Sequence, residues 1–264
     1  NNFYVEAVYW LAKNKPHIDG LYLDGIAFDR VTMRRVRMVL DDACLEKNRT
    51  CEIDFHSGNT NASPMRKVSP VLAILQHMPY FDSLWLGEGF WWNRGPDYYL
   101  VEASGIPFGL TSETLGAPFE ISMLYGMAPR VTDIHTQKYA HSLWNLWDVF
   151  EIQKSLMYGY WSSDCPISVI GNKNIKATAY VRDDVGTALV AIGAFNLASK
   201  NMNIQLSSKK WSFYSMLYIS KNRKPHDVKY KNETINIRLP GQSGGFLLLA
   251  KYKSTLLSLL DGVI

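Results

Sequence analysis

Cysteine is scarce in this sequence, long apolar runs are missing, and several catalytic motifs are absent. There are 3 cysteines among 264 residues. No stretch approaches the roughly 18 apolar residues of a membrane helix, so we expect no membrane span. The chain also lacks a Gly-x-Ser-x-Gly elbow, a Cys-x-x-Cys pair, a His-Glu-x-x-His helix and a Walker loop. These absences argue against the serine-hydrolase, dithiol, zinc-protease and nucleotide-hydrolase chemistries that such motifs mark.

Charge of one sign is equally lacking. The sequence has 28 Lys and Arg against 24 Asp and Glu, a net charge of +4. The single basic cluster, at Arg34, Arg35 and Arg37, has helical spacing and is interpreted as a solvated helix face. We therefore expect no nucleic-acid partner.

Aromatic residues, in contrast, are abundant. They make up 13% of the chain, with 8 Trp and 15 Tyr, within a hydrophobic content of 47%. Core packing explains most aromatic residues in proteins of this size. Aromatic residues in Gly-rich loops, such as Trp91 and Trp92 after Gly89, also suit stacking against sugars.

Residues 1–165 alternate between helical and strand patterns with short connections. Helices are predicted over residues 3–13, 31–44, 70–77, 96–104 and 140–154, and strands over residues 18–26, 51–55, 82–86, 106–110 and 156–161. Such alternation indicates a parallel sheet covered by helices. The predicted fold class is α/β, with the C-terminal part of a (β/α)₈ barrel formed by about five strands.

Residues 166–264 have a different pattern. Six segments of alternating character, separated by turn residues, predict an antiparallel β-sandwich; they cover residues 175–180, 187–195, 202–206, 211–219, 234–239 and 245–252. We expect a domain boundary near residue 165. Because a complete barrel needs eight strands, we also expect a second chain or an upstream segment to complete it.

The predicted parallel strands end in polar groups, at Asp24, His56, Glu88 and Glu113. A barrel collects such strand ends around one opening, where catalytic groups lie. Asp24, followed by Gly25, is the nucleophile candidate. Its alternative role is a helix cap, which Asp29 fits better because it lies nearer the next helix.

Glu88 is the acid/base candidate. Glycines flank it, and the nearby aromatics give it an apolar setting, which raises the pKa of a carboxyl group. Its alternative role is an ion pair with an arginine such as Arg94.

Other residues near these strand ends are candidate substrate contacts. They are His56, Trp91, Trp92, Asn93, Glu113 and Trp161. Core packing of the tryptophans, a salt bridge of Glu113 and a loop contact of His56 are the alternatives. Asp54 and His56 share one strand face, but no further ligands cluster with them, so neither a metal nor a cofactor is expected.

Cysteines and sequons bear on localisation. Cys44 and Cys51 close a short polar loop and are a plausible disulfide, which leaves Cys165 free or paired to another chain. Asn-x-Ser/Thr sequons occur at Asn48, Asn61 and Asn232. Together they favour a secreted, extracellular or lumenal protein.

A strand ending Tyr22-Leu23-Asp24-Gly25, a strand ending at Glu88 and a following sandwich resemble the C-terminal half of retaining α-galactosidase-like barrels of clan D. That resemblance implies that Asp24 ends strand four as nucleophile and Glu88 ends strand six as acid/base. The segments 20–30, 83–93 and 98–116 are also similar to glycoside-hydrolase-like proteins related to family 123. The sequence departs from each pattern at one point. It lacks the Lys-x-Asp of the α-galactosidase pattern at the nucleophile position, where Tyr22-Leu23-Asp24 stands, and it lacks the adjacent Asp-Glu pair expected of substrate-assisted hexosaminidases in family 123.

The sequence thus predicts a glycoside hydrolase that acts on carbohydrate by a two-carboxylate, retaining mechanism. Retention requires the carboxyl groups of Asp24 and Glu88 to lie about 5–5.5 Å apart, and inversion about 6.5–9.5 Å. The alternative is a non-catalytic extracellular scaffold or carbohydrate-binding assembly component, which a pocket filled by side chains or an arginine bonded to Asp24 would favour.

Overall fold

The computed structural model describes most of the chain in two compact units, Asn1–Leu115 and Gly116–Ile264. The described residues are 2–25, 28–57, 74–86, 95–97, 100, 111–115, 118–131, 134–195, 202–208, 215–220, 223–228, 230–231, 234–239, 244–252, 254 and 259. Among them, no helix has both the length and the apolar character needed to cross a membrane.

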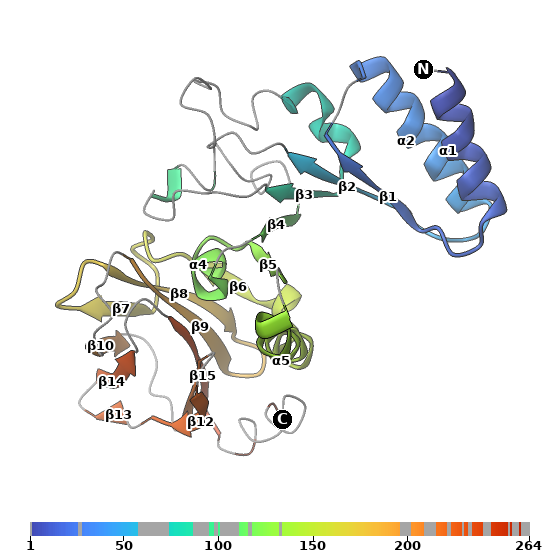
Figure 1. The fold of residues 1–264 in the computed structure, drawn as a ribbon. Coiled ribbons are helices and arrows are strands. Elements are labelled where there is room, and N and C mark those ends of the chain that lie inside the picture. Colours follow the sequence, from blue (N-terminus) through green and yellow to red (C-terminus); the bar gives the residue numbers. More distant parts are fainter. Residues whose placement is uncertain are drawn as a thin grey trace. The chain divides into compact units, whose positions relative to one another are not determined.

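The first unit alternates helices with parallel strands (Figure 1). Its elements are α1 (Asn2–Asn14), β1 (Gly20–Asp24), α2 (Arg30–Leu45), β2 (Glu52–Ser57), the 3₁₀ helix η1 (Leu75–Tyr80), β3 (Ser83–Leu86) and β4 (Thr111–Leu115). Strands β1, β2, β3 and β4 pair side by side in that order, and every pair is parallel.

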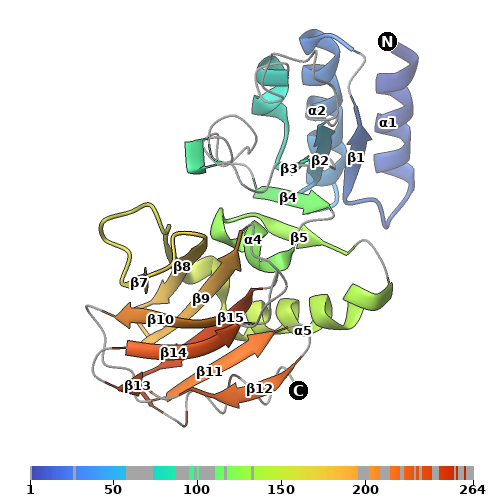
Figure 2. The same cartoon turned by 60° about the vertical axis from the view of Figure 1, so that its left-hand side comes forward.

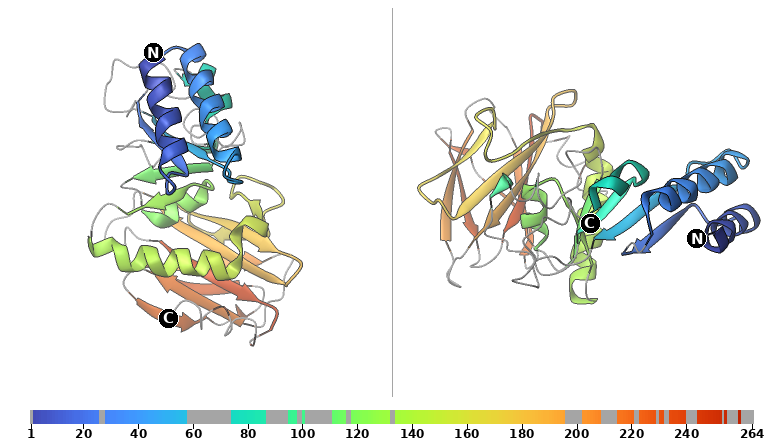
Figure 3. Two further views of the ribbon diagram at one scale, coloured as in Figure 1. Left: turned by 90° about the vertical axis from the view of Figure 1, so that its right-hand side faces the viewer. Right: turned by 90° about the horizontal axis from the view of Figure 1, so that it is seen from above.

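Helices α1 and α2 lie side by side against the sheet (Figures 1 and 3). The apolar residues of α2 recur at helical spacing, and Met33, Val36 and Leu40 are fully buried. Asp29 caps the helix, because its carboxylate accepts the backbone N–H of Thr32 at 2.7 Å. This confirms that the cap falls on Asp29.

The second unit begins with α4 (Phe119–Leu124), β5 (Ala128–Arg130), α5 (Ile134–Phe150), η4 (Ile152–Lys154) and β6 (Leu156–Tyr158). The remaining strands are β7 (Ile167–Ile170), β8 (Ile175–Arg182), β9 (Thr187–Ala194), β10 (Met202–Ser208), β11 (Ser215–Ser220), β12 (Arg223–Asp227), β13 (Tyr230–Lys231), β14 (Thr234–Leu239) and β15 (Gly245–Ala250). They form a six-stranded sheet, β12-β11-β15-β9-β8-β6, and a four-stranded sheet, β13-β14-β10-β7 (Figure 2).

Two layers of core hold this unit together. Alternate residues of β8, β9 and β15, among them Val190 and Leu247, pack with Ile235 and Ile237 of β14 between the two sheets. The opposite face of the six-stranded sheet packs against α5, where Leu189 and Phe246 meet side chains such as Leu143 of the helix.

The predicted fold class is confirmed: a parallel α/β part of a barrel precedes an antiparallel sandwich. Two details of the prediction were wrong. Residues 156–158 pair antiparallel with β8 and so belong to the sandwich sheet rather than to the barrel. The sandwich also has the short strands β7, β12 and β13, which its sequence pattern did not reveal.

Two further expectations meet the structure only partly. The strand predicted over residues 106–110 lies outside the described residues. The strand that the structure describes directly after this segment is β4, which begins at Thr111. Helix α5 and strand β6 precede residue 165 but belong to the compact unit that contains the sandwich. The domain boundary near residue 165 stays a prediction.

The loop between α2 and β2 is fastened at both ends. Cys44 and Cys51 form the predicted disulfide, with Cα atoms 6.0 Å apart. Arg37, predicted to lie on a solvated face, instead reaches across this region: it donates to the carbonyl of Cys51 at 2.7 Å and to Asp82 at 2.5 Å, and it pairs with Asp41. Its charge is therefore used within the fold.

Candidate active site at the ends of the parallel strands

One row of residues crosses the four parallel strands, at or next to the last residue of β1, β2 and β3 and at the middle of β4. From β1 to β4 the row consists of Asp24, His56, Trp85 and Glu113, each opposite the next in register. Strands that pair in register are about 4.8 Å apart. The sheet therefore collects at one edge three of the four polar positions that the sequence places at strand ends.

The alternation of side chains decides which face this row occupies. Leu23, Phe55 and Leu84, each one position before a member of the row, are buried. Adjacent residues of a strand point to opposite faces, so Asp24, His56 and Trp85 point away from this buried apolar layer. On that face the side chain of Asp24 is 76% exposed and that of His56 is 17% exposed.

Asp24 is the exposed member of the row. Its side chain is 76% exposed, and one carboxylate oxygen lies 3.0 Å from Nδ1 of His56. The chain then turns through Gly25 at φ +81°, a left-handed conformation that suits glycine. The backbone N–H of Gly25 donates to the carbonyl of His56 at 3.3 Å, which fixes the position of Asp24 at the strand end.

His56 is held by three neighbours. Its Nδ1 lies 3.0 Å from the hydroxyl of Tyr22 as well as from Asp24, and its ring stacks on Trp85 with centroids 4.2 Å apart and planes 15° apart. The Nε2 atom is shielded from solvent and has no hydrogen-bond partner among the described residues. If Nδ1 carries the proton, it donates to the carboxylate of Asp24, and the buried Nε2 is left as an acceptor only. If Nε2 carried the proton instead, a buried N–H would lack an acceptor and a lone pair of Nδ1 would face the carboxylate. The arrangement therefore assigns the proton to Nδ1, pointing at Asp24.

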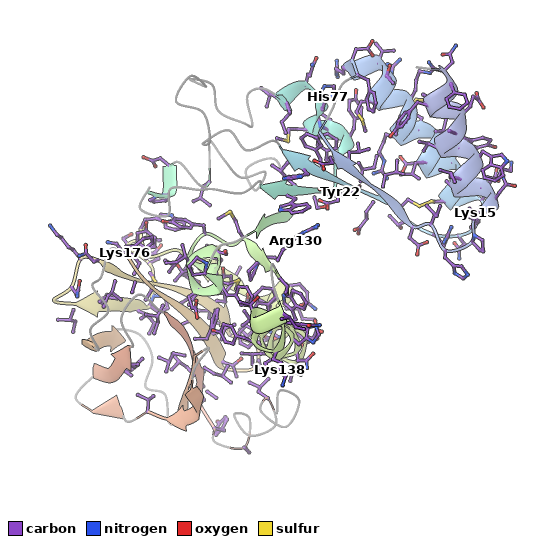
Figure 4. All side chains as sticks on the ribbon, viewed as in Figure 1. Lys15, Tyr22, His77, Arg130, Lys138 and Lys176 are labelled. Atoms are coloured by element: carbon purple, nitrogen blue, oxygen red, sulfur yellow. A yellow bond between two sulfur atoms is a disulfide. The ribbon has the colours of Figure 1, made fainter. Side chains whose placement is uncertain are left out.

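Aromatic rings surround this pair. Tyr22 is 46% exposed and its ring centroid lies 5.4 Å from that of Trp85 (Tyr22 is labelled in Figure 4). An apolar ring beside an exposed carboxylate matches a sugar, which has both an apolar face and hydroxyl groups. Tyr22 was not singled out from the sequence, although its position two residues before Asp24 on one strand places both on the same face.

Asp54 lies one step further back on the same face of the sheet. Its carboxylate accepts a hydrogen bond from the hydroxyl of Ser83 at 2.9 Å. That bond links β2 to β3 below the row, so Asp54 has a role in holding the sheet.

Several predicted site residues lie outside the described part of the chain. They are Glu88, Trp91, Trp92 and Asn93, together with the sequon residues Asn61 and Asn232. Glu113, predicted to follow a strand, is instead the third residue of β4 and is placed only by its register with Trp85. The assignment of Glu88 as acid/base, and its distance from Asp24, therefore stay predictions.

Trp161 belongs to the second unit, in the turn that follows β6. It is 39% exposed and stacks on Tyr125, with ring centroids 6.0 Å apart and planes 12° apart. Gly159 makes room for it, because a Cβ there would come within 2.3 Å of the indole. An exposed, well-supported indole suits a sugar contact, and that role of Trp161 stays a prediction.

Comparison with known families gives two matches that cover most of the chain. Residues 1–132 match the model of the TIM-barrel domain of glycoside hydrolase 123, and residues 139–247 match its C-terminal domain. A comparison with curated proteins gives no match.

Solved structures share the fold at low sequence identity. A maltogenic alpha-amylase from Thermotoga neapolitana has a TM-score of 0.52 at 12% identity, over 95% of this chain and 66% of that one. An alpha-amylase from Anoxybacillus has a TM-score of 0.59 at 10% identity, over 96% of this chain and 64% of that one. A GH27 β-L-arabinopyranosidase from Geobacillus stearothermophilus has a TM-score of 0.52 at 12% identity, over 94% of this chain and 61% of that one. The chain thus spans slightly less than two thirds of the length of these enzymes.

Proposed function

Because the chain belongs to glycoside hydrolase family 123, we propose that the protein hydrolyses glycosidic bonds, with Asp24 and Glu88 as its two reacting carboxylates. The observation that carries this proposal is the row at the strand ends. It presents an exposed carboxylate, held by a histidine N–H, beside the aromatic rings of Tyr22 and Trp85. The substrate class is carbohydrate.

The proposed mechanism proceeds with retention in two displacements. Asp24 attacks the anomeric carbon as Glu88 gives its proton to the leaving oxygen, so the glycosidic bond breaks and a glycosyl ester forms. Glu88, now a carboxylate, takes a proton from water, whose oxygen then displaces Asp24 from the sugar. The N–H of His56 keeps the Asp24 oxygen oriented through both steps. All protons are exchanged between Glu88, water and the leaving group, so no cofactor enters the scheme.

Exposure of Asp24 supports the enzyme over the non-catalytic scaffold. Within the described residues its partner is His56 and not an arginine, and its side chain is 76% exposed. A carboxylate whose role was purely structural would gain more from an arginine fork, which binds a carboxylate with two hydrogen bonds.

A screen of aryl-glycosides and glycan fragments tests the proposal. We expect hydrolysis by the native chain and a loss on the order of 10³-fold or more in Asp24→Asn and Glu88→Gln. Asp42→Asn is the matched control, because Asp42 is an exposed aspartate of the same unit on helix α2. Activity that survives both substitutions, or that falls equally in the control, would refute the site.

We also propose that a second chain or an upstream segment completes the barrel. Among the described residues β1 pairs only with β2. Added strands would pair with the other edge of β1. Hydrogen exchange tests this: backbone amides of β1 should exchange more slowly in the protein isolated from its natural source than in these 264 residues alone. Equal exchange would contradict it.

A secreted or lumenal location is proposed as well. The Cys44–Cys51 disulfide supports it, since such bonds persist in oxidising compartments. Asn48, the one sequon asparagine among the described residues, is exposed in the loop that this disulfide closes. Peptide mapping of protein from a secreting host should find glycan on Asn48; unmodified Asn48 together with free thiols at both cysteines would contradict the location.

A further inference from the structure

The second unit contains a cavity of about 860 Å³ that the proposed hydrolysis does not use. It lies at the edge of the sandwich, between the turn that follows β6 and the segment that crosses from β7 in one sheet to β8 in the other. Cavities of roughly 300–1,000 Å³ are typical of sites for small ligands. All of its lining residues fall between Tyr160 and Ala177, within the described part of the chain.

The lining divides into an apolar floor and a polar rim. Ile167, Ile175 and Ala177 form part of the floor and belong to the core between the sheets. The rim carries serine hydroxyls, the amides of Asn172 and Asn174, and two lysines, Lys173 and Lys176. Such a combination of hydroxyl, amide and cationic donors above an apolar floor suits a polar ligand.

The charged side chains that line the cavity are both lysines, and the exposed Asp164 lies in the chain between the lining residues Ser163 and Cys165 without itself lining the cavity. No carboxylate occurs among the residues that line the cavity, and no described carboxylate forms an ion pair with Lys173 or Lys176. The ammonium group of Lys176 lies over the ring of Tyr160, 5.2 Å from its centroid, a contact that favours this position of the lysine (Lys176 is labelled in Figure 4). A positive site whose lysine is positioned in advance favours an anionic ligand.

Aromatic side chains extend the site beyond the cavity. The ring of Tyr160 meets that of Trp161 edge to face with centroids 5.0 Å apart, and Trp161 is 39% exposed. The turn that carries both is fastened to the sheet, because the N–H of Tyr160 donates to Thr178 at 3.2 Å and the thiol of Cys165 lies 3.4 Å from the carbonyl of Tyr158. A sugar next to one bound in the cavity could stack on this indole.

We infer that the sandwich unit binds an acidic saccharide, with its anionic group at Lys176 and Lys173 and a neighbouring sugar on Trp161. The shared chemistry is an anion on a sugar ring, a carboxylate or a sulfate. Binding at this site does not require Asp24, so its test is separate from the test of hydrolysis.

Calorimetry with three oligosaccharides tests the inference on the Asp24→Asn chain, which is expected not to turn them over. Hyaluronan hexasaccharide offers carboxylates, chondroitin sulfate hexasaccharide offers carboxylates and sulfates, and chitotetraose is neutral. We expect one or both acidic sugars to bind and the neutral one not to bind. Preference between the two acidic sugars tells which anion the site takes.

Matched lysine variants locate the binding. Lys176→Gln should weaken it by about tenfold or more, the loss expected for a hydrogen bond to a charged group. Lys138→Gln should not, because Lys138 is exposed on α5 and does not line the cavity (Figure 4). Hydrolysis of a neutral aryl-glycoside by the otherwise native chain should be unchanged in both.

Cys165 gives an independent readout, because it lines the cavity and is the free thiol of the chain. Burial raises the pKa of this thiol, so alkylation by iodoacetamide is slow and its rate is measured at mildly alkaline pH. A bound acidic saccharide should slow it further, and inorganic sulfate should not reproduce that protection. Binding of all three sugars alike, equal losses in the two lysine variants, or full protection by sulfate alone would overturn the inference.

Discussion

His56 is the residue on which the geometry of the candidate site depends. It contacts Asp24 and Tyr22 through one nitrogen and stacks on Trp85 through its ring. The sequence predicted His56 as a substrate contact with a loop contact as the alternative. The substrate contact stays a prediction; we propose that His56 also positions Asp24, because its Nδ1 lies 3.0 Å from that carboxylate while its Nε2 is shielded from solvent.

Removal of His56 tests this role. In His56→Ala, Asp24 loses its donor, and we expect kcat to fall by roughly 10- to 100-fold while KM changes by less than about threefold. His56→Asn keeps an N–H donor and should recover part of the loss. A direct substrate contact would instead raise KM with kcat unchanged, and steady-state kinetics of both variants separates the two roles.

His77 is a second histidine with a distinct environment, in η1 near the start of α2 (Figure 4). It is 3% exposed, and its buried Nδ1 has no hydrogen-bond partner within the described part of the chain. Burial lowers its pKa below the ordinary 6.5, the charge of Asp29 opposes that shift and the charge of Arg30 adds to it. The native state therefore resists protonation more than the unfolded chain does.

This histidine should make stability depend on pH. Below pH 6.5 the unfolded chain binds a proton that the native state does not, so the free energy of unfolding falls as pH drops towards the lowered pKa of His77. His77→Leu should flatten that part of a urea-unfolding series between neutral and mildly acid pH. His17→Leu, at an exposed position of the same unit, should leave the slope unchanged; an unchanged slope in His77→Leu would contradict the account.

Helix α2 is tied to the sheet by one arginine as well as by its apolar face. Arg37 bonds Asp82, just before β3, and the carbonyl of Cys51, just before β2, and its side chain is 17% exposed. Asp82 in turn accepts the N–H of Ile53 at 2.7 Å. The helix and two strands thus meet at one ionic network.

Loss of that network should weaken the first unit. We expect Arg37→Gln to lower the free energy of unfolding by about 2 kcal/mol, since it leaves Asp82 and a backbone carbonyl without their charged donor. Arg34→Gln, at an exposed position on the same helix, should change it by less than about 0.5 kcal/mol. Chemical denaturation measures both, and equal effects would show that Arg37 acts only as surface charge.

Local patterns predicted elements well and pairings poorly. Helix α2, its cap Asp29 and the strand that ends at Asp24 followed from periodicity and capping chemistry, which act over a few residues. The three residues of β6 are too few to show which sheet they join, because pairing is decided by distant partners. Arg37 was misassigned for the same reason: helical spacing does not reveal a partner 45 positions away.

The candidate site was predicted only in part. His56 and Asp24 were predicted at one edge of the sheet, but their hydrogen bond and the stacking of His56 on Trp85 could not be predicted without the register of β1 to β3.

Two cores of different design make up the chain. The first unit buries one face of a parallel sheet under helices and leaves a polar row at its strand ends, and the second buries a six-stranded sheet on both faces. Matches to both domains of one glycoside hydrolase family cover 1–132 and 139–247. We propose that the first unit cleaves the glycosidic bond and that the second unit binds an acidic saccharide.

Trapping of a covalent intermediate tests the role of Asp24 most directly. The protein would be incubated with a 2-deoxy-2-fluoro glycoside of the sugar it hydrolyses, bearing an activated leaving group, and analysed by intact-mass and peptide mass spectrometry. Our account predicts a mass increase of one fluoroglycosyl group per chain, on the peptide that contains Asp24, and no increase in Asp24→Asn. Hydrolysis without any trapped ester, or an ester on a residue other than Asp24, would contradict it.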